Sequence, residues 1–335
     1  MKRKRKFTIA RCLPIAVCLL GSALALGQFA AAQQQGGAPP QPQGPRDVMV
    51  TEIPGVVAAG SQWTKVYQVA GNSADGIIAT KDGGILTAQE DPNSVTKIDK
   101  NDKSSVFISG TNGGGSLSVD SKGRILVVER TPPMAIAYLT PEHKIIADTF
   151  QGKTVGALGR LNDLVADKKG GAYFTDGGAY YASANGTITR LDDNLRTNGI
   201  VLSPDQKTLY VTNMKEVVAF DVQPDGSVKN QRSFAQLQAG GNGDGSTVDS
   251  AGRIYVSTGP GVQVIGPDGK YLGLIPTPRP IISVAFSGPK RKTLYIVGAG
   301  AADANGQEIH VGPQKTGRTI YKLPMIAQGI KGQPK

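Results

Sequence analysis

The chain has few of the residues that thiol catalysis and transition-metal sites require. Its 335 residues include only two cysteines and two histidines. Cys12 and Cys18 both lie in an N-terminal segment that we expect to be removed, so the mature protein would have neither a disulfide nor a thiol nucleophile. His143 and His310 are far apart in the sequence, which argues against a zinc site and against a histidine-based triad.

The chain also lacks a concentrated block of basic charge. Its formal net charge is +11, but residues 1–32 hold six basic residues and no acidic one, which leaves +5 for the mature chain. The remaining basic residues are spread along the sequence and are not interleaved with aromatic residues. This distribution argues against a nucleic-acid partner.

Residues 1–32 have the pattern of an export signal. Lys2–Lys6 is basic, Leu13–Leu26 is apolar and uncharged, and Ala30–Ala32 offers a small-residue cleavage site. A membrane span needs about 20 apolar residues, so this shorter run favours a cleaved signal peptide over a retained anchor. We therefore expect a periplasmic or secreted protein with no stable membrane insertion after cleavage.

Composition divides the rest of the chain into three parts. Residues 33–47 are rich in Pro, Gln and Gly and are expected to form a low-complexity tether. Residues 48–324 are expected to form one globular domain, and residues 325–335 a short polar tail.

One short pattern, a turn followed by an alternating apolar strand, occurs six times. The strands begin at intervals of 37 to 47 residues, at Ile85, Ile125, Ala172, Leu209, Ile254 and Leu294. A period of about 40–45 residues with strands in every unit is typical of a β-propeller. We predict an all-β, six-bladed propeller with four antiparallel strands per blade. The last blade lacks one outer strand, which residues 63–69 can supply beside residues 318–323, so that no sheet edge stays exposed.

Equivalent positions of the six repeats should lie on a ring around the central channel. The positions ten or eleven residues before each strand start are Asp75, Gly115, Asn162, Asn198, Asp244 and Ser283. Two are carboxylates and two are carboxamides, and oxygen ligands of this kind suit a hard divalent cation such as Ca²⁺. Asp or Asn before Gly is also an ordinary turn signal, so a purely structural role for each residue stays open.

Four stretches give the chain a resemblance to a known family. They are residues 160–176 (RLNDLVADKKGGAYFTD), 198–212 (NGIVLSPDQKTLYVT), 244–249 (DGSTVD) and 261–265 (GVQVI). With them, the region from about residue 73 to residue 323 resembles the calcium-dependent lactonases and esterases of the senescence marker protein / gluconolactonase group.

The resemblance implies that Asn162, Asn198 and Asp244 ligate the metal and that Arg160 binds the substrate. The family's fourth ligand is a glutamate before glycine in the first blade, where this chain has Asp75. That side chain is shorter by one C–C bond, about 1.5 Å, so its ligation is expected to need a water. Ser283 is assigned no role.

We therefore predict a hydrolase that opens a lactone, of the sugar (aldono) lactone type. A cation at the channel mouth would act as Lewis acid and activate water, and Asp244 is the candidate base. Two alternatives remain open at this point: a non-catalytic exported binding propeller, and a related propeller esterase or phosphotriesterase. The expected partner is a small-molecule lactone or ester, and the sequence leaves the oligomeric state undetermined.

Overall fold

The computed structural model describes residues 44–69, 75–192, 194–310, 317–332 and 335. The expected signal peptide and residues 33–43 of the expected tether lie outside these residues. Among the described residues, the only helix is the short 3₁₀ turn η1 (Pro289–Arg291). No helix in this part of the chain is long and apolar enough to cross a membrane.

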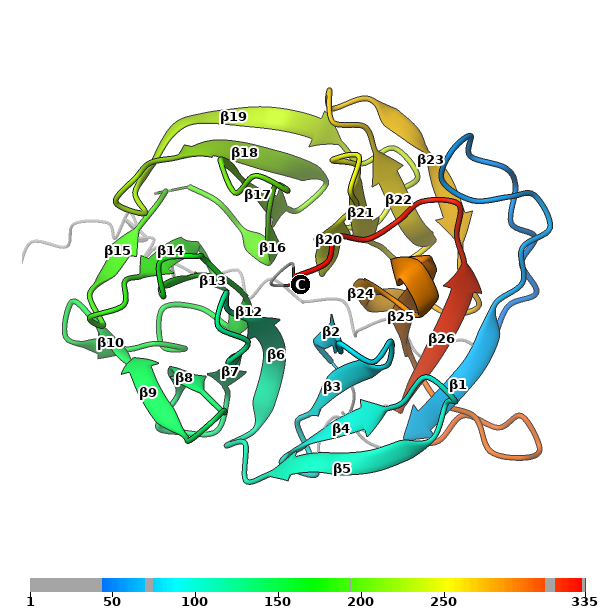
Figure 1. Ribbon diagram of the computed structural model, residues 1–335, viewed down its shortest axis with the longest axis horizontal. Helices are drawn as coiled ribbons and strands as arrows, with labels where there is room; N and C mark the ends of the chain where they lie inside the picture. Colours follow the sequence, from blue (N-terminus) through cyan, green and yellow to red (C-terminus); the bar gives the residue numbers. More distant parts are fainter. Residues whose placement is uncertain (1–43, 70–74, 193, 311–316, 333–334) are drawn as a thin grey trace, which may run out of the picture. The chain divides into compact units, whose positions relative to one another are not determined.

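The described strands form six four-stranded antiparallel sheets and one small hairpin. Figure 1 shows the six sheets arranged as blades around a centre. The first three blades consist of the following strands in order: β2 (Ile77–Ala79), β3 (Ile85–Gln89), β4 (Ser94–Ile98) and β5 (Ser104–Ser109); β6 (Gly114–Val119), β7 (Ile125–Glu129), β8 (Ala135–Tyr138) and β9 (Lys144–Ala147); β12 (Leu161–Ala166), β13 (Ala172–Asp176), β14 (Ala179–Ala182) and β15 (Ile188–Arg190).

The other three blades follow the same order from the centre outward. They are β16 (Thr197–Leu202), β17 (Thr208–Asn213), β18 (Glu216–Val222) and β19 (Val228–Gln236); β20 (Ser246–Val248), β21 (Ile254–Ser257), β22 (Gly261–Ile265) and β23 (Tyr271–Pro276); and β24 (Ile281–Ser287), β25 (Thr293–Ala299), β26 (Arg318–Pro324) and β1 (Thr64–Val69). The hairpin β10 (Thr149–Phe150) and β11 (Lys153–Thr154) precedes the third blade.

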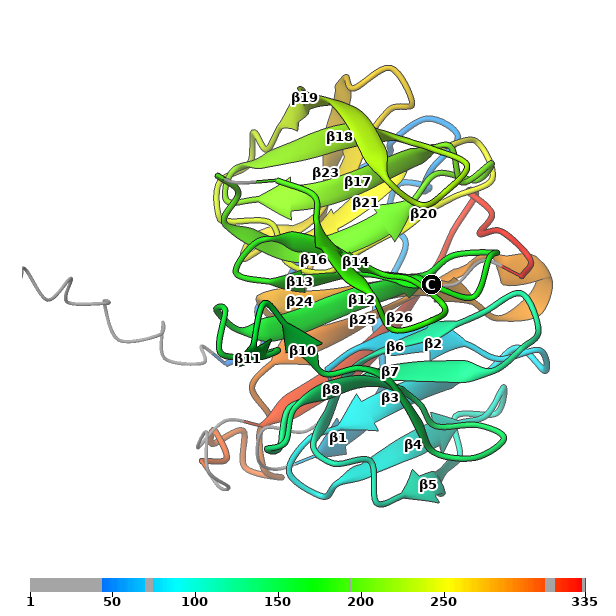
Figure 2. The same cartoon turned by 90° about the vertical axis from the view of Figure 1, so that its left-hand side faces the viewer.

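The ring closes as the sequence predicts. Strand β1 pairs antiparallel with β26, with Val69 opposite Arg318 and Thr64 opposite Lys322. The outer strand of the last blade therefore comes from the N-terminal side, and β26 is not left as an exposed edge. The inner strands β2, β6, β12, β16, β20 and β24 contact one another in turn around the centre. Figure 2 shows the blades from the side, with β12 above β6.

The core lies between neighbouring blades because both faces of the middle strands are covered. Strands β3, β7, β13 and β22 are buried along their whole length, and their sequences are rich in Ile, Val, Leu, Ala and Tyr. Fully buried strands with mostly apolar residues are expected where a sheet packs on both faces. One apolar cluster joins blades three and four through Tyr173, Ile200 and Phe220.

The segments on either side of the blades pack against the propeller. Val56 and Val57, which precede β1, belong to one apolar cluster with Met325 and Ala327, which follow β26. The segment expected to be a polar tail therefore has buried apolar anchors. It continues past Gly329, which bridges to Asp249, and its end lies at the centre of the ring in Figure 1.

Candidate metal centre

The four predicted ring ligands line one small cavity at the channel. Asp75, Asn162, Asn198 and Asp244 come from four different blades, and each side chain is half-buried. The cavity has a volume of about 10 Å³, which is about the room that a single water molecule or ion needs. The repeat register therefore brings these four residues together, as the repeat spacing predicts.

Of the two other positions considered in the sequence, Ser283 lines the cavity and Arg160 does not. Ser283, the ring position of the last blade, is buried and also lines the cavity. Arg160 is exposed two residues before Asn162 and does not line the cavity. It follows a loop that Asp176 holds through a hydrogen bond from the Gly156 backbone N–H at 2.5 Å.

The glycines after three ring residues are not turn residues. Gly76, Gly199 and Gly245 do not have positive φ, and Gly199 lies within β16. A Cβ at Gly199 would lie 2.2 Å from the Asp244 backbone oxygen, and a Cβ at Gly76 would lie 2.6 Å from the Cα of Ser116. Glycine is required because neighbouring inner strands approach closely at the level of the ring.

At the same level, single backbone hydrogen bonds join neighbouring inner strands. Gly76 N–H donates to the Gly115 oxygen at 2.9 Å, and Gly245 N–H donates to the Ile282 oxygen at 2.9 Å. This contact fixes the spacing of the ring residues and explains the Asp-Gly and Asn-Gly pairs without a turn.

The cavity concentrates negative charge. Burial, together with the neighbouring charges of Asp75 and Asp163, raises the pKa of Asp244 to about 7. Asp163 follows Asn162 in β12, is buried, and also lines the cavity. It accepts hydrogen bonds from the Ser116 hydroxyl at 2.5 Å and from the Ile200 backbone N–H at 3.0 Å. The charges of Asp75 and Asp163 thus disfavour the ionised form of Asp244 when no cation is bound.

Arg130 and Lys335 form ion pairs with carboxylates of this cavity, and Arg318 lies near enough to interact with Asp75 and Asp244. Lys335 forms its ion pair with Asp163, which lines the cavity. Arg130, directly after β7, forms an ion pair with Asp75 and a second one with Glu90 at 3.0 Å. Arg130, Lys335 and Arg318 lie outside the ring register, so superposing the repeats could not identify them.

The donor set fits a hard cation. It contains carboxylate and carboxamide oxygens from four blades, with no histidine or cysteine lining the cavity. Calcium binds six to eight oxygens, including waters, and two aspartates would balance its charge. Asp75, Asn162, Asn198 and Asp244 are the residues that would hold it.

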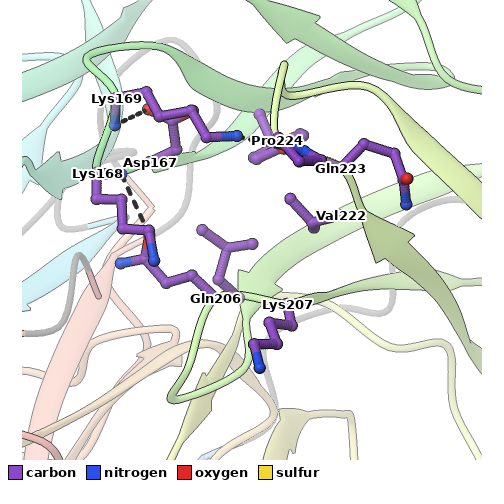
Figure 3. Close-up of a pocket in the computed structure, with 10 residues that line it drawn as sticks. Asp167, Lys168, Lys169, Gln206, Lys207, Val222, Gln223 and Pro224 are labelled. Atoms are coloured by element: carbon purple, nitrogen blue, oxygen red, sulfur yellow. Dashed lines mark hydrogen bonds between the residues drawn. The ribbon is translucent and has the colours of Figure 1, made fainter.

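A larger pocket lies elsewhere in the propeller. It has a volume of about 270 Å³ and lies between blades three and four, at the turns that follow β12 and β16. Figure 3 shows Lys168, Lys169 and Lys207 around it, and the Lys169 ammonium donates to the Gln223 backbone oxygen at 2.8 Å. These turns are at the opposite ends of the inner strands from Asn162 and Asn198, so this pocket is separate from the metal centre.

The protein is thus a six-bladed propeller with a small central cavity that carboxylate and carboxamide oxygens line. The family model described as "SMP-30/Gluconolactonase/LRE-like region" matches residues 92–300. The chain belongs to this family.

Several named relatives are similar to parts of the chain. A gluconolactonase of Zymomonas mobilis is 26% identical over 217 residues, which cover 55% of this chain and 60% of that protein. The pentonolactonase XacC of Haloferax volcanii is 30% identical over 188 residues, which cover 51% of this chain and 64% of that protein. The chain thus spans less than two thirds of the length of these two curated relatives.

Solved structures share the fold over most of the chain. A gluconolactonase from Xanthomonas campestris is similar with a TM-score of 0.68 and 23% identity, covering 86% of this chain and 99% of that one. A calcium-binding regucalcin from Agrobacterium tumefaciens is similar with a TM-score of 0.64 and 18% identity, covering 82% of this chain and 97% of that one.

Proposed function

We propose that this protein is a calcium-dependent lactonase that hydrolyses a lactone of the sugar (aldono) lactone type. The observation that carries the proposal is the set of two carboxylates and two carboxamides, from four blades, around one ion-sized cavity. Relatives named gluconolactonase and pentonolactonase support the reaction class. A structural neighbour described as a calcium-binding regucalcin supports the choice of metal.

In this reaction water adds to the lactone carbonyl carbon, the ring C–O bond breaks, and the ring oxygen takes up a proton. The product is a hydroxy acid. When bound, a divalent cation supplies Lewis-acid polarisation of the carbonyl and lowers the pKa of water. Hydrolysis at neutral pH releases one proton, because the product carboxylic acid ionises.

Asp244 is the residue that we assign to proton transfer. It lines the cavity, and it is a carboxylate, a kind of group that can take up the proton of an attacking water. Arg160 is assigned to substrate orientation, because it is exposed and lies two residues before Asn162. We also propose that the protein acts after export and removal of residues 1–32, which the intact mass of the exported protein would test.

The test is the hydrolysis of a panel of aldonolactones and simple esters, followed by proton release, with calcium and with a chelated control. We expect a chelator-sensitive rate above the spontaneous one for at least one lactone. A rate equal to the spontaneous one across the panel would instead favour the non-catalytic binding propeller.

Asp244→Asn separates the two roles that this residue can have. An asparagine can still offer an oxygen to the metal but cannot accept the proton. If Asp244 is the base, the variant stays folded and nearly inactive at saturating calcium. Recovery of the rate by excess calcium would show that Asp244 serves only as a ligand.

A further inference from the structure

Arg130 reaches the ring at a position where its own blade offers no side chain. The ring position of the second blade is Gly115, and a Cβ there would lie 2.2 Å from the Cζ of Arg130. The absence of a side chain at Gly115 therefore makes room for the guanidinium. Five of the six blades present a polar side chain at the ring register, and the second blade presents Arg130 from the end of β7 instead.

All five N–H donors of Arg130 have acceptors. Nε donates to the Leu161 oxygen at 3.0 Å, and Nη2 donates to the Asn162 backbone oxygen at 2.8 Å and to Asn162 Oδ1 at 2.7 Å. Nη1 donates to Asp75 Oδ2 and, at 3.0 Å, to Glu90 Oε2. The guanidinium thus joins blades one, two and three.

Two of these acceptors are atoms that a cation would use. Asp75 Oδ2 and Asn162 Oδ1 belong to two of the four predicted ligands, and Arg130 binds both. The amide oxygen of a third predicted ligand, Asn198, is also hydrogen-bonded, because Asn162 Nδ2 donates to Asn198 Oδ1 at 2.8 Å. A cation that takes these oxygens has to displace the hydrogen bonds that Arg130 donates to Asp75 and Asn162. It also has to displace the bond that Asn162 Nδ2 donates to Asn198 Oδ1.

The charge of Arg130 is permanent at this site. A guanidinium keeps its proton in proteins, and the carboxylates of Asp75 and Glu90 lie beside that of Arg130. The side chain is 7% exposed, so water screens its charge only weakly. A divalent cation bound by Asp75 would therefore lie close to the positive charge of Arg130, which also contacts Asp75. Like charges that are close together repel strongly in a partly buried site.

Resting on the proposed metal-dependent function, we propose that Arg130 is an internal counter-cation that competes with the metal. It holds Asp75 and Asn162 in the metal-free protein and lowers the affinity of the ring for a divalent cation. This role differs from that of a residue that only positions the ligands, because the two roles predict opposite effects when the charge is removed.

The experiment measures the Kd for calcium, added as calcium chloride alone, by titration calorimetry on the full chain. The proteins are the wild type, Arg130→Gln and the charge-preserving Arg130→Lys. We expect Arg130→Gln to bind calcium about tenfold or more tightly than the wild type, while Arg130→Lys stays within about threefold of it. Without metal, Arg130→Gln should melt at a lower temperature, because Asp75 then lacks its cationic partner.

The outcomes separate this inference from the proposed function. If the wild type binds calcium and Arg130→Gln binds it equally or more weakly, Arg130 is a positioning residue and the inference is overturned, while the lactonase proposal stands. If no variant binds calcium, the metal site itself fails. If Arg130→Gln folds only when calcium is added, the competition is supported, and failure to fold with calcium present overturns it.

Discussion

Calcium binding should depend steeply on pH because a proton occupies the site in the metal-free protein. The pKa of Asp244 is raised to about 7 by burial and by the charges of Asp75 and Asp163. Below that pH the metal has to displace the proton, since ligating carboxylates must be ionised. At pH 5 only about 1% of the Asp244 side chains are ionised, so calcium should bind about 100-fold more weakly than at pH 8, or about 2.7 kcal/mol.

The raised pKa of Asp244 also decides whether the metal-free protein becomes more or less stable as the pH rises. Because the pKa of Asp244 is higher in the folded state than in the unfolded chain, the folded state holds the proton more tightly. The free energy of unfolding without metal should therefore fall as the pH rises from about 4 to about 7. Added calcium should reverse this trend in the upper part of the range, because it binds the ionised carboxylate.

The assay is calorimetric titration with calcium at several pH values between 5 and 8, in two buffers with different heats of ionisation. The two buffers give the number of protons that are released on binding, which should approach one below pH 7. An affinity that is flat over this range, with no proton release, would mean that Asp244 has an ordinary carboxyl pKa and that the electrostatics described for the cavity are wrong.

Three substitutions test other parts of the account. Asp75→Glu should tighten calcium binding about tenfold, because the carboxylate reaches about 1.5 Å further; weaker binding would show that the shorter side chain suits this ring. Arg160→Ala should raise the KM for the lactone about tenfold and change kcat by less than about threefold if it only orients the substrate, and a loss confined to kcat would contradict this role. Gly199→Ala should lower the free energy of unfolding by about 1–3 kcal/mol, because its Cβ would lie 2.2 Å from the Asp244 backbone oxygen. Gly259→Ala, where a Cβ meets nothing within 4 Å, is the matched control in urea denaturation, and equal effects of the two changes would refute the packing argument.

The blade architecture could be predicted because each repeat carries its own local signals. Alternating apolar strands and turn residues recur in all six units. The second strand of each blade therefore begins at the predicted residue or within one residue of it. Closure by β1 also followed from counting strands, since the last blade had one too few. The convergence of Asp75, Asn162, Asn198 and Asp244 followed from the same register, because symmetry-related positions of a propeller meet at its centre.

The contacts that cross between blades could not be predicted in this way. Arg130 lies outside the ring register, and nothing in the sequence shows that Gly115 leaves space for it until the strands are placed. The Asp-Gly and Asn-Gly pairs resembled turns, and only the close approach of inner strands explains them. Lys335 reaches Asp163 from a segment whose composition predicts only a short polar tail.

The central claim is that four side chains from four blades hold one cation, and a crystal structure of the calcium-loaded protein tests it most directly. The account predicts one ion in the ring, with oxygens of Asn162, Asn198 and Asp244 at about 2.3–2.6 Å and with Asp75 bound directly or through one water. An ion bound elsewhere, or ring oxygens that at saturating calcium still accept hydrogen bonds only from Arg130 and from Asn162 Nδ2, would contradict it.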